Sequence, residues 1–129
     1  MRPVPDLALF AARSKPWAFA AVAAIAFLAA TPAGAAAPAY VGTWSVDAKA
    51  CKIPQERQGA PMVIRRTGYD QHEAHCAFKS LRRSGSAWWV SAQCTVEGSK
   101  MRDSFTMRVK GDTMVMARGQ DKRTLKRCR

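Results

Sequence analysis

Apolar and polar residues alternate one by one through most of the chain beyond residue 40, and this period of two constrains the fold more than any other feature. Successive side chains of a strand point to opposite faces, so the pattern is typical of a sheet with one buried face. Turn-forming residues separate the alternating runs. The sequence therefore predicts an all-β fold, an antiparallel meander of six or seven strands forming a small barrel or half-barrel.

The limits of several elements follow from this pattern. We expect a first strand over residues 40–46 and a second, short strand over residues 62–66. The segment between them reads as a loop, with a turn of helix as an open alternative, because it contains several residues that interrupt regular structure: Pro54, Gly59 and Pro61. Helix should be a minor component beyond Ala35.

Residues 71–83 and 87–96 are predicted to form a hairpin around Ser84-Gly85-Ser86. If Arg83 faces Ala87, the same register sets three further cross-strand pairs: Cys76 with Cys94, Phe78 with Ala92, and Ser80 with Val90. Opposite residues of an antiparallel pair are close enough for their side chains to interact. We therefore predict a Cys76–Cys94 disulfide and, by elimination, a Cys51–Cys128 disulfide.

A second hairpin is predicted around Gly111-Asp112, a two-residue turn of the kind that closes antiparallel strands. It places Val109 beside Met114 and Met107 beside Met116, all on one face. The last strand, over residues 123–128, is less regular, and we expect a bulge or an early end there. The predicted core comprises Trp44, Val46, Phe78, Trp88, Val90, Phe105, Met107, Val109, Met114 and Met116.

Residues 1–35 are typical of a secretory signal peptide. Basic residues precede the apolar run 17–30, which is shorter than the roughly 20 residues that span a bilayer. Ala33-Gly34-Ala35 then supplies small residues for cleavage, which we place after Ala35; an uncleaved N-terminal anchor is the alternative. Residues 36–129 would form one disulfide-linked domain, periplasmic or secreted, with no transmembrane helix after cleavage.

The chain is strongly basic. Its formal charge is +12, from 21 Lys and Arg against nine Asp and Glu. Residues 1–35 hold three of the basic residues and one of the acids, so residues 36–129 carry 18 minus 8, or +10. Such a charge favours anionic partners through long-range attraction.

A set of short motifs spreads over nearly the whole of residues 36–129: Gly42-Thr43-Trp44, Cys51, Cys76, Trp88, Cys94, Glu97-Gly98, Gly111-Asp112 and Arg127-Cys128. In this order they resemble small exported cysteine-containing proteins of alphaproteobacteria that have no established function. The resemblance implies export and a shared fold, and it supplies no catalytic residues.

His72-Glu73-Ala74-His75 is the one candidate metal motif. Helical zinc motifs need histidines four apart, whereas these are three apart and would point to opposite faces of a strand. Asp70 with His72, or Glu73 with His75, would supply two ligands where closed zinc sites use four. We therefore predict no metal site. Because the sequence also lacks a nucleophile motif and paired carboxylates, we predict no cofactor and no catalytic residues, and interpret the domain as non-enzymatic, with a small enzyme or a metal-binding protein as a less favoured alternative.

The predicted registers gather one solvent-side face as a candidate binding surface: Lys79, Leu81, Arg83, Trp89, Arg108 and Lys110. Trp89 would lie opposite Leu81 and close to Lys110, exposed among cations; the alternative is that it packs under a loop. Anionic envelope glycans, lipid head groups or a protein partner suit such a face. Nucleic acid is not expected for an exported protein.

The turn region of the first predicted hairpin, residues 84–88, also resembles part of a different class of interaction protein. Periplasmic lysozyme inhibitors include small exported β-barrels with two disulfides, and residues 84–88 are similar to the serine-glycine loop that some of them insert into the enzyme. Because those lysozymes are themselves basic, two cationic surfaces would repel each other during encounter. The lysozyme-inhibitor interpretation is therefore the alternative.

Overall fold

The computed structural model describes residues 34–129. The predicted signal peptide over residues 1–35 lies outside these described residues except for its last two, so neither it nor the cleavage position is tested.

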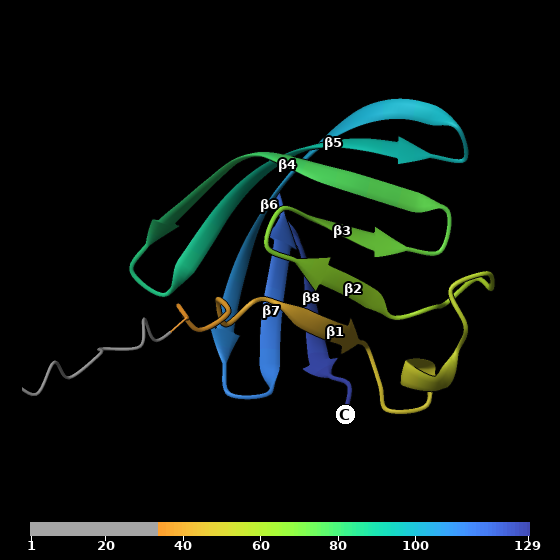
Figure 1. Ribbon diagram of the computed structural model, residues 1–129, viewed down its shortest axis with the longest axis horizontal. Coiled ribbons are helices and arrows are strands. Elements are labelled where there is room, and N and C mark those ends of the chain that lie inside the picture. The colour runs from red at the N-terminus through yellow and green to blue at the C-terminus, as the bar shows by residue number, and fades with distance from the viewer. Residues whose placement is uncertain (1–33) are drawn as a thin grey trace, which may run out of the picture. The chain divides into compact units, whose positions relative to one another are not determined.

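Residues 34–129 form a closed antiparallel barrel in which each strand pairs with the next and the last pairs with the first (Figure 1). The strands are β1 (Gly42–Ser45), β2 (Met62–Arg65), β3 (Gly68–Gln71), β4 (Ala74–Ser84), β5 (Ala87–Val96), β6 (Ser99–Lys110), β7 (Thr113–Arg118) and β8 (Asp121–Arg127). One short 3₁₀ helix, η1 (Ala50–Lys52), follows β1. The prediction of an antiparallel all-β fold with minor helix is confirmed, and the barrel has eight strands rather than six or seven.

The additional strand is β3, of which the sequence pattern assigned only the last residue, Gln71, to a strand, the one predicted to begin there. Its glycine, Gly68, lies against β4 so closely that an added Cβ would be 2.2 Å from the backbone oxygen of Cys76. His72 and Glu73 form the turn between β3 and β4, since Gln71 already pairs with Ala74. The predicted strand start at residue 71 is therefore wrong.

The β4–β5 hairpin is long and strongly bent; Figure 1 shows it in green and teal, with its turn at the lower left. The half of the hairpin farther from the turn, which we call the inner half, has the predicted register, with Cys76 opposite Cys94 and Phe78 opposite Ala92. A β-bulge at Lys79 then shifts the pairing by one residue, so that the predicted partnership of Ser80 with Val90 is wrong. The outer half instead has these pairs: Ser80 with Ser91, Leu81 with Val90, Arg82 with Trp89, Arg83 with Trp88, and Ser84 with Ala87.

The β6–β7 hairpin follows the prediction. Met107 pairs with Met116, and Val109 pairs with Met114, around the turn at Gly111-Asp112. Of the two irregularities expected in the last strand, the structure has the early end, because β8 stops at Arg127 and Cys128 lies beyond it. The backbone N–H of Cys128 then donates to the oxygen of Thr43, 2.8 Å away, beside β1.

Most of the predicted core residues are buried inside the barrel or pack against that interior. Val46 is the exception, because β1 ends at Ser45 and leaves the Val46 side chain 62% exposed. The backbone then turns into η1, where the N–H of Ala50 donates to Asp47 Oδ1. The barrel interior also contains residues that the alternation did not identify: Tyr40, Met62, Ile64, Tyr69, Ala92 and Leu125.

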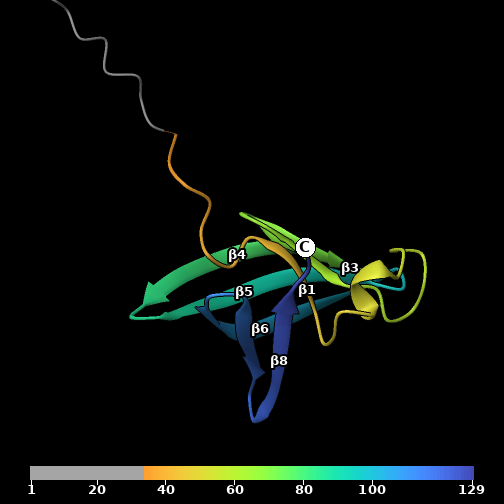
Figure 2. The same ribbon diagram turned by 90° about the horizontal axis from the view of Figure 1, so that it is seen from below.

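Both predicted disulfides are present: Cys76–Cys94 joins β4 to β5, and Cys51–Cys128 joins the segment after β1 to the end of the chain. Such bridges are consistent with an oxidising, extracytoplasmic environment. Figure 2 shows the end of the chain beside β1, where Cys51–Cys128 reinforces the closure of the barrel.

Candidate binding face

The outward-pointing positions of β4 to β8 form one surface, which we call the basic face. Directly opposite residues of an antiparallel pair lie on the same side of the sheet, so the registers connect these positions into rows across the strands. The central row is Arg82, Trp89, Thr106, Ala117 and Lys122, one residue from each of the five strands.

Basic side chains are spread over this whole surface. All of its Lys and Arg residues are exposed: Arg82, Lys100, Arg102, Arg108, Lys110, Lys122 and Lys126. Among the outward positions of β4 to β8 that the structure describes, none is Asp or Glu. The positive charge of the basic face is therefore not neutralised by carboxylates within it.

The aspartates near these strands lie outside the outward positions of β4 to β8 and have partners of their own. Asp103 pairs with Arg118 on the inward side of the sheet, and Asp112 pairs with Arg127 and Arg129 at the β6–β7 turn. Asp70, on β3, pairs with Arg65 and His75. Their negative charge is already matched by these arginines, so it compensates little of the charge on the basic face.

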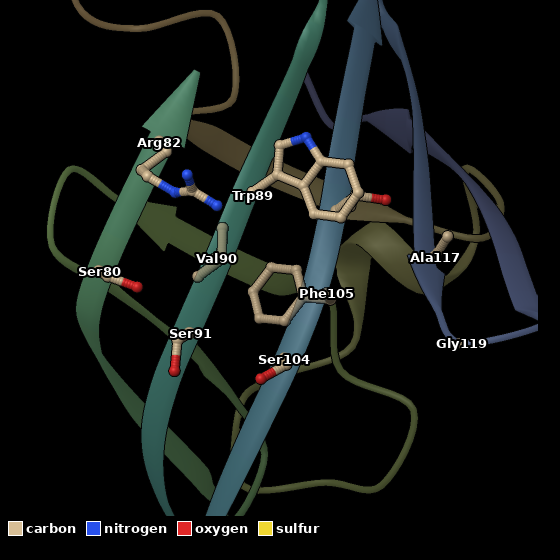
Figure 3. Close-up of a pocket in the computed structure, with 10 residues that line it drawn as sticks. Ser80, Arg82, Trp89, Val90, Ser91, Ser104, Phe105, Ala117 and Gly119 are labelled. Carbon is tan, nitrogen blue, oxygen red and sulfur yellow. The ribbon is translucent and has the colours of Figure 1, made fainter. Parts of the chain in front are cut away.

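Trp89 is the large aromatic residue of the basic face, and 52% of it is exposed. In Figure 3 the guanidinium of Arg82 points from β4 toward Trp89, whose indole extends from β5 across β6. An open hollow of about 460 Å³ lies beside this indole. Arg82 and Trp89 line this hollow. Most of its other lining residues are small or bear a hydroxyl: Ser80, Ser91, Ser104, Thr106, Ala117 and Gly119.

The structure places only some of the residues that the sequence assigned to this surface on the basic face. Trp89, Arg108 and Lys110 do lie on the basic face. Leu81 and Arg83 do not, because the bulge at Lys79 turns them to the opposite side, where Leu81 packs against the core and the Arg83 guanidinium lies 5.3 Å from the Trp88 ring centroid. Lys79 itself is the unpaired residue of the bulge and is exposed.

The predicted neighbours of Trp89 are also wrong. Its cross-strand partners are Arg82 and Thr106, whereas Leu81 faces Val90 and Lys110 lies further along β6. The alternative that Trp89 packs under a loop does not describe this structure, given its exposure. Sequence reasoning missed Arg82 and Lys122, since the first depends on the bulge and the second on the register between β7 and β8.

A second polar cluster lies on the inner side of the sheet. The Tyr69 hydroxyl donates to Asp103 Oδ2 at 3.0 Å, and Arg118 Nε and Nη2 each donate to Asp103 at 2.9 Å. Burial, and then the charge of Asp103, raises the pKa of Tyr69 to about 12. The Arg118 guanidinium also lies 5.0 Å from the Phe105 ring centroid. Because each charge has a partner, this cluster serves to satisfy buried polar groups.

Arg118 also borders a smaller cavity of about 250 Å³ at one mouth of the barrel. Its floor is apolar, formed by Trp44, Met62, Met116 and Leu125, and Arg123 contributes to its lining. Arg118 is neutralised by Asp103, and Asp121 Oδ2 lies 3.7 Å from Arg123 Nε. The charges around this mouth are thus balanced, in contrast to the basic face.

The two histidines of the candidate metal motif have separate partners. His72 Nδ1 lies 3.1 Å from the backbone oxygen of Gln55, and His75 Nδ1 lies 2.9 Å from Asp70 Oδ1. The pairings considered from sequence, Asp70 with His72 and Glu73 with His75, do not occur in these hydrogen bonds. Residues 34–129 contain no group of three or more His, Cys, Asp or Glu side chains arranged to hold a metal ion.

In comparisons with known proteins, the sequence matches no protein-family model, no curated protein and no solved structure. Within the part of the chain that the structure describes, no helix has the length and apolar character needed to cross a membrane. Residues 34–129 are thus a disulfide-linked antiparallel barrel with a cationic surface whose outward strand positions hold no carboxylate.

Proposed function

We propose that this protein is a non-enzymatic binding domain that acts in the periplasm or outside the cell and engages an anionic component of the envelope through the basic face. The observation that carries the proposal is the segregation of charge: exposed Lys and Arg residues cover the outward side of β4 to β8, and its described positions include no carboxylate. A field of one sign raises the local concentration of polyanions and speeds their encounter with the surface.

The structural context supports a role outside the cytoplasm. One disulfide joins the two strands of the β4–β5 hairpin and the other joins segments 77 residues apart, and bridges of this kind persist in oxidising compartments. The polyanions available there are acidic glycans, the phosphates of lipopolysaccharide and anionic lipid head groups. Each presents several charges at spacings that a broad cationic surface can meet at once.

The proposal predicts that binding to polyanions depends on salt and on the basic face. Purified oxidised protein should bind polygalacturonate, or vesicles rich in phosphatidylglycerol, at about 20 mM NaCl and release them as the salt rises toward about 500 mM, where charges are screened within a few ångströms. The double variant R82Q/K122Q should bind about thirtyfold more weakly at low salt, since each lost cation near an anionic surface removes roughly 1 kcal/mol.

The matched control is K52Q/R57Q, which removes the same charge from exposed positions near η1, away from the basic face. If the control weakens binding as much as R82Q/K122Q does, attraction comes from net charge alone and the basic face is not the site. Salt-insensitive binding, or no binding to any polyanion, would overturn the proposal.

The lysozyme-inhibitor alternative concerns the exposed β4–β5 turn. Arg83 Nε donates to the oxygen of Gly85, and Arg108 Nη1 donates to Ser86 Oγ, so two cations lie at this turn. Entry into a basic enzyme would bring like charges together. Inhibition of cell-wall lysis at near-stoichiometric protein would favour the alternative over the basic-face proposal.

A further inference from the structure

The geometry around Trp89 points to the chemical class of the anionic component: we infer that the basic face binds an acidic saccharide, with one sugar ring stacked on Trp89 and its acid group against Arg82. This inference rests on the proposed function of the same face. It adds a specific contact to the long-range attraction.

The indole of Trp89 is presented as a platform. Its cross-strand partners are Arg82 and Thr106, and the row continues to Ala117, a small side chain (Figure 3). The hollow of about 460 Å³ beside the ring is open to solvent. The face of an aromatic ring is electronegative, so it attracts the weakly positive C–H groups on one side of a sugar ring.

Hydroxyl groups border the platform on one side. Ser80, Ser91 and Ser104 form a continuous row across β4, β5 and β6, and all three line the hollow. Two hydroxyls near the β4–β5 and β6–β7 turns accept hydrogen bonds from cations instead, Ser86 from Arg108 and Thr113 from Lys126. Hydroxyls that both donate and accept, placed next to an aromatic ring, match the polar edge of a saccharide.

Arg82 supplies the charge specificity. It lies directly opposite Trp89, and its guanidinium points toward the indole (Figure 3). A guanidinium presents parallel N–H donors that suit the two oxygens of a carboxylate. A sugar acid stacked on Trp89 would therefore meet a cation beside the ring, whereas a neutral sugar would leave that donor to water.

A lipid surface fits these observations less well. Membrane-surface segments insert several apolar side chains together. Among the described residues, the other exposed large hydrophobic side chains are Val46, which follows β1, and Met101, which pairs with the inward-facing Cys94. Neither lies on the basic face. The apolar residues that line a hollow with Trp89, which are Ala87, Val115 and Ala117, are buried or half-buried, so among the described residues of this face Trp89 is the one exposed large hydrophobic side chain.

The test uses isothermal titration calorimetry at low salt with three probes: a galacturonate oligosaccharide, a neutral maltooligosaccharide of the same length, and inorganic polyphosphate. We expect wild-type protein to bind the acidic oligosaccharide more tightly than the neutral one. W89A should weaken that binding by about tenfold, and W89F should retain most of it, because a phenyl ring still provides a stacking surface. Binding of polyphosphate, which has no ring to stack, should be the same in all three proteins.

A second variant tests the hollow without removing Trp89. S91Y places a bulky ring in the row of serines at an outward strand position, where aromatic residues are well tolerated. It should block the acidic oligosaccharide and leave polyphosphate binding unchanged. Circular dichroism and the melting temperature of each variant verify that its fold is intact.

The outcomes separate this inference from the proposed function. If W89A and S91Y bind the oligosaccharide as wild type does while polyanion binding stays salt-dependent, saccharide stacking is wrong and the basic-face proposal stands. If anionic vesicles bind in a Trp89-dependent manner and the oligosaccharides do not, the ligand is a lipid surface and the inference is overturned. If no polyanion binds, the proposed function fails as well.

Discussion

The buried Tyr69 hydroxyl makes the stability of the fold depend on pH. It lies inside the barrel, donates to Asp103 Oδ2, and receives a longer hydrogen bond of 3.4 Å from Arg118 Nη2. Ionising it would place a negative charge in a poorly solvated site beside the carboxylate of Asp103. Both effects raise the pKa of Tyr69 to about 12, with burial as the larger cause.

This shift predicts a loss of stability at alkaline pH. The unfolded chain releases the Tyr69 proton near pH 10 and the folded chain releases it near 12, so the stabilisation is fully present below pH 10 and is lost as pH rises toward 12. Over this window the wild type should lose about 1 kcal/mol per pH unit relative to Y69F. Urea unfolding of both proteins at pH 9 and pH 11 measures the difference; parallel changes in the two proteins would contradict the assigned cause.

At the scale of elements, the bulge in β4 decides which residues reach the basic face. The Cys76–Cys94 pair fixes the register of the inner half of the hairpin, and the Ser84–Ala87 pair fixes the outer half. The two registers differ by one residue, and Lys79 absorbs the difference. A shift of one residue exchanges the two faces of a strand, so the bulge turns Leu81 inward and Arg82 outward.

The bulge therefore predicts opposite effects for two adjacent substitutions. L81A should lower the free energy of unfolding by about 1–2 kcal/mol, because Leu81 is partly buried against the core. R82A should change stability by no more than about 0.5 kcal/mol, as is usual for an exposed site, and weaken binding to acidic oligosaccharide. Chemical denaturation gives both free energies. A uniform register would give the reverse order, with R82A the more destabilising.

Local patterns predicted much of this fold where they were uninterrupted. The β6–β7 hairpin follows from clean alternation on both sides of Gly111-Asp112, and both disulfides follow from one correct register and elimination. The strand β3 was missed because two of its four residues, Asp70 and Gln71, are polar and Gly68 adds no side chain to the pattern. Its partners come from tertiary packing, which a single strand's sequence does not encode.

The residues of the candidate site were likewise predictable only where the alternation of apolar and polar residues is regular. Trp89, Arg108 and Lys110 belong to strands with regular alternation, and the structure places all three on the basic face. Arg82 and Lys122 required two pieces of information that the sequence pattern lacks, the bulge in β4 and the pairing of β7 with β8. The central row across five strands appears only when every register between them is known.

For the whole molecule, the pairing of β1 with β8 closes the barrel, and within residues 34–129 it joins fewer residues than any other strand pair. Its register pairs are Trp44 with Arg127 and Ser45 with Lys126, whereas β4 and β5 pair along nearly their full lengths. Side-chain contacts add to it: Arg127 donates to the backbone oxygens of Val41 and Ala39, and its guanidinium lies 4.2 Å from the Trp44 ring centroid. The Cys51–Cys128 disulfide reinforces this closure covalently.

The two disulfides should thus contribute unequally. Cys51 and Cys128 are 77 residues apart in the chain and Cys76 and Cys94 are 18 apart, so loop-closure entropy in the unfolded state favours the first, with contributions of roughly 4 and 3 kcal/mol. C51S/C128S should lower the midpoint of urea unfolding more than C76S/C94S does. It should also speed amide hydrogen exchange selectively in β1 and β8, because a weakened closure opens there first.

The same variant separates stability from binding. The central row of the basic face depends on pairings within β4 to β8, none of which includes the β1–β8 closure. Under conditions where C51S/C128S remains folded, its affinity for acidic oligosaccharide should therefore stay within about twofold of wild type, a change below roughly 0.5 kcal/mol. Loss of binding while the amides of β4 to β7 and those around Lys122 in β8 stay protected from exchange would show that the ligand also contacts the closure, and the basic face would then have to extend to β1.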